Sequence, residues 1–244
     1  MIERVSMTIE SNNRQIGAYL SERPQKEHEK YLCRILERSD DGFNGRLLDI
    51  GCATGATLLL IRELFPTAEL HGLELSPALI ERAKENLQNY DVHLHSADAF
   101  SFEPEKPYDI LIASGILAVF ENPYPVLDKW LSWLTPKGKL IIFSAFNSND
   151  LDVKIKFRNR QNDQSWETGF AWYSKARIAE FFLAKGYSTE FERFVLPIDL
   201  EKDANPIRQY TVRLENGERM LVNGANLIFE QYFMIARPST LKKT

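Results

Sequence analysis

The chain has 244 residues, of which 44% are hydrophobic and 26% are charged, and this balance excludes a largely disordered protein. Its net charge of −4 gives no global positive field for nucleic acid, and no segment has the roughly 18 consecutive apolar residues of a membrane span. Its two cysteines, Cys33 and Cys52, are too few for a disulfide framework. We therefore expect one enlarged domain in a cytoplasmic protein, either a monomer or a homodimer.

The first part of the chain predicts a helix and then a strand–turn–helix unit. Pro24 opens a segment in which apolar side chains recur at helical spacing from Tyr31 to Leu36. The run RLLDI at 46–50 predicts a short strand. Glycines follow it, and the stretch ATLLLIRELF then predicts a helix that Pro66 closes.

The same alternation continues toward the middle of the chain. AELHGLEL predicts a second strand, and Ser76 followed by Pro77 predicts the N-cap and first residue of the next helix. Three further strands are predicted at DVHLHSAD, DILIASG and GKLIIFSAF, with a helix at 124–134. Because DILIA and LIIF are continuously apolar, we expect them to be covered on both faces. The pattern therefore predicts an α/β fold with a doubly wound, mainly parallel sheet.

The alternation stops after Phe146. Residues 147–172 are polar with interspersed aromatics and are long for a plain loop. Ser174 predicts the cap of a helix that Gly186 ends, and YSTEFERFVL predicts a strand after it. Asn216-Gly217 predicts a type I′ turn in a hairpin, and IFEQYFMIARP predicts the strand that completes the sheet.

The run from Asp49 to Gly55, DIGCATG, lies between the first strand and the first helix. Its small residues allow a ligand to approach the backbone, although a tight turn without a ligand needs similar residues. Glu74 ends the second strand, where an acid accepts hydrogen bonds from ribose hydroxyls of either a dinucleotide or S-adenosylmethionine. Ala53 replaces the second glycine of a dinucleotide fingerprint, and the Asp49 carboxylate would repel a pyrophosphate but attract a sulfonium. These residues favour the sulfonium cofactor.

Three segments, LLDIGCATG, GLELS and SADAF, resemble motif I, the acidic second-strand motif and the adenine motif of class I S-adenosylmethionine-dependent methyltransferases. The resemblance covers residues 45–146 and extends to a helix, a strand, a hairpin insertion and an antiparallel seventh strand after them. It implies S-adenosylmethionine as cofactor and S-adenosylhomocysteine as product. The site residues that it implies are Gly51, Cys52, Ala53 and Gly55 along the methionine moiety, Glu74 at the ribose with Leu75 beside it, Asp98 and the Ala99 amide at the adenine, and Ser114 and Gly115 at the methionine end, with Asp49 below.

We accordingly divide the single domain 1–244 into three parts. Residues 1–44 form an N-terminal helical segment, 45–146 the cofactor-binding half, and 147–244 the substrate-side half with a hairpin insertion at about 197–225. The first segment and the hairpin carry aromatics such as Tyr19 and Tyr210, and we expect both to cover the site as lids. For the hairpin, a dimer contact is an equally good interpretation.

The sequence identifies no catalytic residue. Methyl transfer by in-line displacement needs chiefly orientation and exclusion of water, and a base is optional. His28, Glu121 and Asp199 are candidate bases that no motif supports. The histidines at 71, 93 and 95 have no cysteine or carboxylate partner at metal-ligand spacing, so we expect no metal.

The acceptor is predicted to be a small anionic or aromatic molecule held between 147–173 and the hairpin. Ser114-Gly115-Ile116-Leu117 replaces the Asn/Asp-Pro-Pro-aromatic motif of nucleic-acid amino-methyltransferases. The basic stripe, defined as Lys154, Lys156, Arg158 and Arg160, is followed by the aromatics Trp166, Phe170, Trp172 and Tyr173. A solvated strand and a hydrophobic anchor would also explain these residues. Other functions left open are RNA or protein methylation, a catalytically silent S-adenosylmethionine-binding protein, and an NAD-dependent oxidoreductase.

Overall fold

The computed structural model describes residues 26–158, 166–202 and 208–239 of the chain. Tyr19, assigned above to a lid, and Arg160, assigned to the basic stripe, lie outside these ranges. Within them, no helix is long and apolar enough to cross a bilayer.

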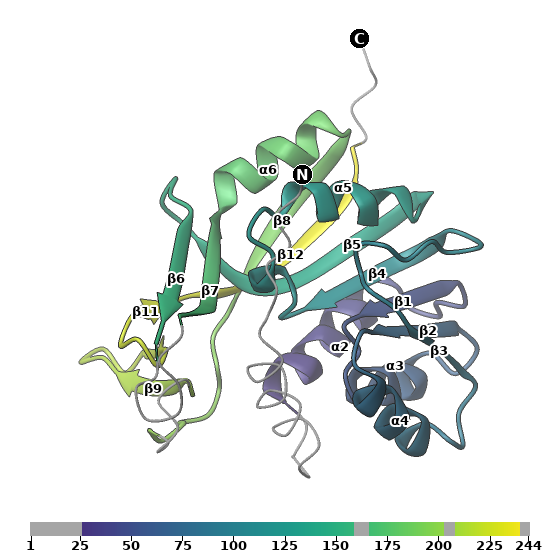
Figure 1. Ribbon diagram of the computed structural model, residues 1–244, viewed down its shortest axis with the longest axis horizontal. Helices are drawn as coiled ribbons and strands as arrows, with labels where there is room; N and C mark the ends of the chain where they lie inside the picture. Colours follow the sequence, from purple (N-terminus) through teal and green to yellow (C-terminus); the bar gives the residue numbers. More distant parts are fainter. Residues whose placement is uncertain (1–25, 159–165, 203–207, 240–244) are drawn as a thin grey trace.

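The central sheet has the strand order β3-β2-β1-β4-β5-β12-β8 (Figure 1). Strands β1 to β5 run parallel, whereas β12 is antiparallel to both of its neighbours, β5 and β8. The predicted doubly wound, mainly parallel sheet of seven strands with an antiparallel last strand is therefore confirmed. The bounds are β1 Arg46–Ile50, β2 Glu69–Glu74, β3 Val92–Ser96, β4 Tyr108–Ser114, β5 Leu134–Asn147, β8 Tyr187–Phe194 and β12 Gln231–Pro238.

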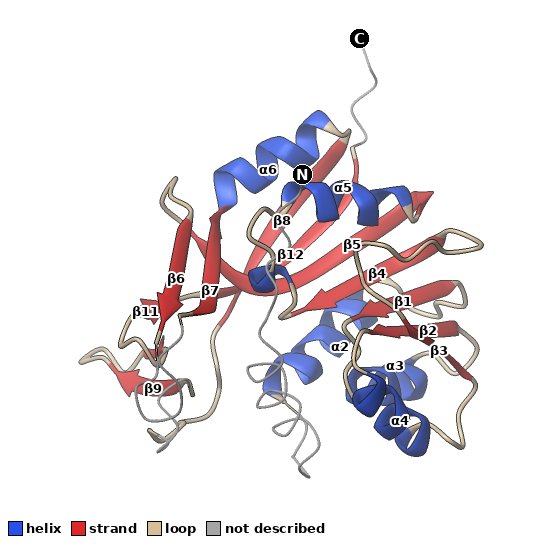
Figure 2. Cartoon of the chain, viewed as in Figure 1, coloured by secondary structure: helices blue, strands red, loops and turns tan. Residues whose placement is uncertain are grey.

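Helices cover both faces of this sheet (Figure 2). On one face, α2, α3 and α4 pack over a core cluster that includes Leu36 and Ile61, and on the other α5 and α6 pack over a cluster that includes Trp130 and Phe182. The bounds are α2 Glu27–Ser39, α3 Ala56–Leu64, α4 Pro77–Asn86, α5 Tyr124–Ser132 and α6 Lys175–Ala184, with a short 3-10 helix η1 at Leu117–Val119.

Strand β4 shows why its sequence is continuously apolar. Ile110 and Ile112 lie in the cluster beneath α2 and α3, whereas Leu111 and Ala113 lie in the cluster beneath α5 and α6. All four are at most 1% exposed. Successive side chains of a strand point to opposite faces, so the middle of a strand that is covered on both sides is apolar at every position from Ile110 to Ala113.

The helix starts follow the capping residues that the sequence supplies. The Ser76 hydroxyl accepts a hydrogen bond from the Leu79 amide at 3.5 Å, and Pro77 is the first residue of α4. Ser174 accepts from the Arg177 amide at 3.2 Å in the same way, and α6 ends before Gly186, which has φ +83°. Both predicted caps are confirmed, because each satisfies an amide that the first turn leaves unpaired.

Strands β6 and β7 form one small β-structure next to the central sheet, and strands β9 to β11 form another, at the left of Figure 1. Strand β6 (Val153–Phe157) pairs antiparallel with β7 (Glu167–Ser174), which also pairs with the last residues of β5. Strands β9 (Tyr210–Arg213), β10 (Arg219–Val222) and β11 (Ile228–Phe229) form a three-stranded sheet. Trp172 of β7 stacks on Phe229 of β11, with ring centroids 5.7 Å apart, which joins the two structures.

Two local predictions are wrong. The hairpin between β9 and β10 has no type I′ turn, because Gly217 has φ +81° whereas Asn216 is not left-handed. Leu214 and Glu218 close it, and a three-residue loop with a left-handed glycine needs only one such residue. Strand β5 begins at Leu134 rather than Gly138, because Leu134 pairs with Tyr108 across a register shift.

Candidate functional site

The loop between β1 and α3 has a backbone that few sequences can adopt. Gly51, Ala53 and Gly55 have φ values of +76°, +48° and +79°, in the left-handed region. The Gly51 and Cys52 amides both donate to the carbonyl of Leu73 in β2, at 2.7 and 3.1 Å. At Gly55 a Cβ would lie 2.6 Å from Leu87 Cδ1, so glycine is required for packing as well as for φ. The loop is therefore fixed against β2 at its carboxyl end.

Glu74 is held by backbone amides on both sides. Its Oε2 accepts from the Ala53 amide at 3.1 Å, and its Oε1 accepts from the Ser76 amide at 2.9 Å. Each carboxylate oxygen offers about two acceptor positions, so both retain capacity for a ligand hydroxyl. The next side chain, Leu75, is 57% exposed, which places an uncovered apolar surface beside the carboxylate. This pair suits a ribose with an aromatic base attached.

Asp49 lies beneath the loop in an acidic environment. The residue is only 2% exposed, and its pKa is raised to about 7, first by burial and then by the negative charges of Glu29 and Glu74. Lys26 partly opposes this shift. Since the ionised form is disfavoured by both desolvation and like charge, a cation placed here would stabilise it. Ammonium and sulfonium groups have this property.

Cys52 contributes only its backbone to this surface. Its side chain is 5% exposed, and a Cβ on Gly72 would lie 2.8 Å from its sulfur. Burial, with the charges of Asp49 and Glu74, raises the pKa of the thiol well above its usual range. The thiol is therefore a packing group of the β2 face and not a nucleophile.

The end of β3 carries the predicted adenine residues. Asp98 Oδ1 accepts from the amides of Phe100 and Ser101, at 2.7 and 3.3 Å, which closes a turn. The carbonyl of Ala99 accepts from the indole of Trp130 at 3.1 Å, so α5 fixes the backbone there. Adenine binding by Asp98 and the Ala99 amide stays a prediction. The second carboxylate oxygen of Asp98 takes no part in this turn and would accept the hydrogen bond from adenine.

The loop after β4 completes the edge of the sheet. The Gly115 amide donates to the carbonyl of Phe143 at 2.8 Å, and its φ is +75°. A Cβ on Gly115 would meet no atom within 4 Å, whereas one on Gly51 would lie 3.2 Å from Ile116 Cδ1. The loops that carry Gly51 and Ser114-Gly115 are therefore in contact, with open space beside the second glycine.

These observations test whether S-adenosylmethionine fits the residues present. The buried acidic cluster matches its cationic groups, the amide-held Glu74 matches a ribose, and exposed Leu75 matches an apolar base.

Residues 42–190, more than half of the chain, match a family model described as a methyltransferase domain. The chain belongs to this family. The predicted class I S-adenosylmethionine-dependent methyltransferase and its cofactor are confirmed at this level, and the NAD-dependent oxidoreductase is excluded.

Known relatives agree with this assignment. The chain is 31% identical over 105 residues to the malonyl-(acyl-carrier protein) O-methyltransferase of Halalkalibacterium halodurans, covering 41% of this chain and 38% of that protein. It is 34% identical over 95 residues to the trans-aconitate 2-methyltransferase of Methylobacterium radiotolerans, covering 39% and 36%. The match thus spans less than half the length of these curated relatives.

Solved structures show the same fold. The 1,6-didemethyltoxoflavin-N1-methyltransferase of Burkholderia thailandensis, solved with its substrate and S-adenosylhomocysteine, has a TM-score of 0.58 to this chain. The alignment covers 93% of this chain and 83% of that one at 13% identity. At this identity the likeness supports the fold and carries no information on the acceptor.

The three candidate bases lie in different environments. His28 stacks on Phe143 with centroids 4.5 Å apart, and burial lowers its pKa to about 3, so it is a weak base. Asp199 pairs with Arg213 and Arg219 at 2.5 and 2.7 Å, which lowers its pKa and holds it in the small sheet. Glu121 is half-buried near Tyr173. Among the described residues, none of the three forms a hydrogen bond or an ion pair with the loop of Gly51.

The acceptor-side residues separate into exposed cations and packed aromatics. Lys154 and Lys156 alternate with half-buried apolar residues on β6 and are exposed, as the basic stripe requires. The Arg158 guanidinium lies 5.3 Å from the Trp166 ring centroid, and Trp166 is 63% exposed.

The predicted stacking role of two aromatics is better explained by packing. Tyr173 is buried and its hydroxyl donates to the carbonyl of Phe120, while Trp172 stacks on Phe229. Both therefore act as the hydrophobic anchor that the sequence left as an alternative. The side chain of Phe170 lies outside the described part of the chain.

Sequence reasoning missed Glu29, which helps to raise the Asp49 pKa. Glu29 is 6% exposed, and its carboxylate accepts from the Lys26 amide at 3.0 Å at the start of α2. A signal was present, because Glu29 precedes buried Leu32 and Leu36 by three and seven residues and so shares their helical face. A charged residue on a buried stripe indicates a special environment.

Proposed function

We propose that the protein transfers a methyl group from S-adenosylmethionine to a carboxylate of a small acceptor. The observation that carries the first half of this proposal is the buried Asp49 beneath the left-handed loop, where a cation would offset the charges of Asp49 and its two acidic neighbours, Glu29 and Glu74. The second half is supported by the acceptors for which two relatives are named, malonyl-(acyl-carrier protein) and trans-aconitate, because both carry carboxylates.

The chain's own residues would bind and orient the cofactor. Glu74 would accept hydrogen bonds from the ribose hydroxyls, and Asp49 would attract the cationic end of the cofactor. The Ser114-Gly115 loop would border the reacting methyl group. Bound S-adenosylmethionine supplies an electrophilic methyl group. Holding the acceptor in line with the bond to be broken and excluding water then account for most of the rate.

A carboxylate acceptor agrees with the lack of an evident base among the residues that the structure describes. Carboxylic acids have pKa values near 4, so the acceptor is already ionised at neutral pH and has no proton to lose. His28, whose pKa is about 3, would not be required to remove one. The exposed cations Lys154, Lys156 and Arg158 would attract such an acceptor to the β6–β7 side of the sheet.

The test uses S-adenosylmethionine labelled in the methyl group and a panel of trans-aconitate, malonyl thioester on a carrier protein, small amines and RNA. We expect label in a carboxylic acid, released as methanol by mild alkali because the product is an ester. Label that resists alkali would reject the carboxylate. Tight S-adenosylhomocysteine binding without label in any acceptor would support the silent binding protein instead.

The predicted lids remain proposals. The hairpin belongs to the three-stranded sheet, where the Tyr210 hydroxyl donates to Asn226 Oδ1 at 3.2 Å. If the hairpin covers the site, bound S-adenosylhomocysteine should slow its proteolysis. Equal cleavage with and without ligand would favour a dimer contact.

A further inference from the structure

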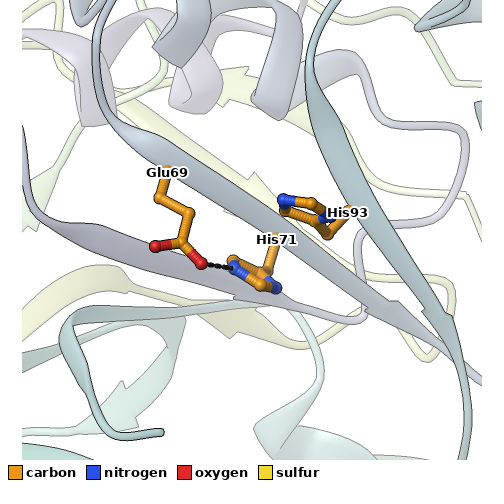
Figure 3. Close-up of side chains that lie close together, drawn as sticks. All are labelled: Glu69, His71 and His93. Carbon is orange, nitrogen blue, oxygen red and sulfur yellow. Dashed lines mark hydrogen bonds and ion pairs between the residues drawn. The ribbon is translucent and has the colours of Figure 1, made fainter.

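Three of the four histidines of the chain gather on one face of β2 and β3. The parallel register places His71 opposite His93, and their ring centroids lie 4.8 Å apart. Glu69 precedes His71 by two residues, so both side chains project from the same face of β2. Its Oε1 lies 2.9 Å from His71 Nε2 (Figure 3). The expectation that these histidines lack a carboxylate partner is therefore wrong.

The three side chains offer a set of metal ligands. One ligand atom each from Glu69, His71 and His93 lies within 4.8 Å of the others. Zinc bonds of about 2.0–2.2 Å to such atoms require separations near 3.3 Å, a closure of roughly 1.5 Å. Glu69 and His93 are exposed and have the rotamer freedom to close it, while buried His71 supplies a fixed ligand.

The surroundings of His71 suit a coordinating imidazole. Its Nδ1 lies 3.0 Å from His95 Nε2, and the two rings are nearly parallel, at 1°. In the tautomer with a proton on Nδ1, His71 would donate to His95 and present Nε2 to an ion. In metal sites, the hydrogen bond donated by the ring nitrogen that does not bind the ion sets the orientation and the tautomer of the imidazole.

The cluster also has access to solvent. Glu69 and His93 both line a surface hollow of about 510 Å³, together with Tyr90 and Asp91. An ion held by three protein ligands at the edge of this hollow would keep a coordination position open toward it. Imidazole and carboxylate ligands are the donors that Zn²⁺ accepts.

We propose that Glu69, His71 and His93 bind a divalent transition-metal ion, with Zn²⁺ as the best match to the ligands. The ion must compete with Arg46 for two of the three ligands, because the Arg46 Nε donates to Glu69 Oε1 at 2.9 Å and its Nη2 lies 3.3 Å from His71 Nε2. Arg46 keeps a separate anchor, because its Nη1 donates to the Lys106 carbonyl at 2.7 Å. The site lies at the amino end of β2, five residues or about 17 Å from Glu74, and so acts apart from the cofactor site.

The test is titration of the chelator-treated, tag-free full chain with ZnCl2 by calorimetry. We expect one ion per chain and a rise in Tm with Zn²⁺. His93→Ala, an exposed change, should lower the affinity at least ~10-fold, and His95→Ala, which removes the partner of His71, by ~10- to 100-fold. Asp91→Asn in the same hollow is the matched control and should bind as the parent does.

A Cys33→Ser variant distinguishes thiol binding, because Cys33 is the more accessible of the two free cysteines. Retained binding in this variant and lost binding in His93→Ala support the proposal. Binding that survives His93→Ala and Glu69→Gln, or no binding to the parent chain, overturns it. Circular dichroism and S-adenosylhomocysteine affinity should be unchanged in His93→Ala, which separates ligand loss from unfolding and from any failure of the proposed methyl transfer.

Discussion

The proposed cofactor-binding half, 45–146, and the proposed substrate-side half, 147–244 (below, the cofactor half and the acceptor half), are held together by different interactions. Around β1, β2 and β4, backbone conformation and amide hydrogen bonds set the site, as at Gly51 and Glu74. Around β6–β7 and β9–β11, long-range aromatic packing such as Trp172 on Phe229 holds the structure, and the polar groups are exposed. The conformation of the cofactor half is thus set by contacts between nearby residues. In the acceptor half, the exposed polar side chains can be replaced without changing the aromatic packing beneath them.

The largest expected effect is on Glu74. Glu74→Ala removes a charged acceptor of ribose hydroxyls, which weakens binding by roughly 1.5–3 kcal/mol, or about 10- to 100-fold. Calorimetry with S-adenosylhomocysteine measures this. Glu81→Ala, which removes an exposed acid paired with Lys84, is the control and should leave affinity unchanged. An unaltered affinity in Glu74→Ala would remove the ribose assignment.

The second prediction concerns pH. Because the folded-state pKa of Asp49 is about 7, most of this carboxyl is protonated at pH 6 and ionised at pH 8. Affinity for S-adenosylmethionine should therefore rise about tenfold between these values. Asp49→Asn should flatten the profile and lower affinity at pH 8; a parent profile that is already flat would contradict the role of this acid.

The raised pKa of Asp49 also affects the free energy of unfolding, which should fall as pH rises, whereas the affinity for the cofactor should increase. The native state retains the Asp49 proton above pH 4, where the unfolded chain loses it, so without ligand this group reduces stability as pH rises from about 4 to 7. Asp49→Asn should remove that decline. Thermal unfolding of both proteins across this range, without ligand, measures the difference.

Local chemistry explains why the cofactor half was predictable. Strand β1 occupies the five residues of RLLDI, and α4 begins at the Ser76-Pro77 pair, because alternation, caps and glycines act over a few residues. The site residues of motif I fall in one heptapeptide for the same reason. Glu29, which lies in the N-terminal segment, was missed because its effect on Asp49 depends on how α2 packs against the sheet.

Long-range relations explain what was missed elsewhere. The stacking of Trp172 on Phe229 joins residues far apart in the chain, and no local pattern encodes it. The histidine cluster likewise depends on the register that sets His71 opposite His93. A one-residue change in register would place the two on opposite faces.

The third prediction tests the acceptor half. Reversing two exposed charges, Lys156→Glu with Arg158→Glu, should raise the KM for a carboxylate acceptor about twofold to tenfold, because exposed charges contribute little each. Cofactor affinity should stay unchanged. Lys106→Glu with Lys137→Glu, exposed near the amino ends of β4 and β5, gives the same net charge as a control. Equal KM values in both double variants would show that the basic stripe is only a solvated surface.

The smallest effect separates two positions of the same loop. Ala53 has φ +48°, where a Cβ costs about 1–2 kcal/mol, and glycine would relieve this at an entropic cost of about 0.5–1 kcal/mol. Ala53→Gly should therefore stabilise the protein by at most about 1.5 kcal/mol in chemical unfolding. Gly55→Ala should destabilise it, because its φ is +79° and the new Cβ would lie 2.6 Å from Leu87 Cδ1. Stabilisation by Ala53→Gly would show that the loop tolerates backbone strain at Ala53. Destabilisation by this change would mean that the Ala53 methyl itself packs against the protein, and that the left-handed φ does not limit this position.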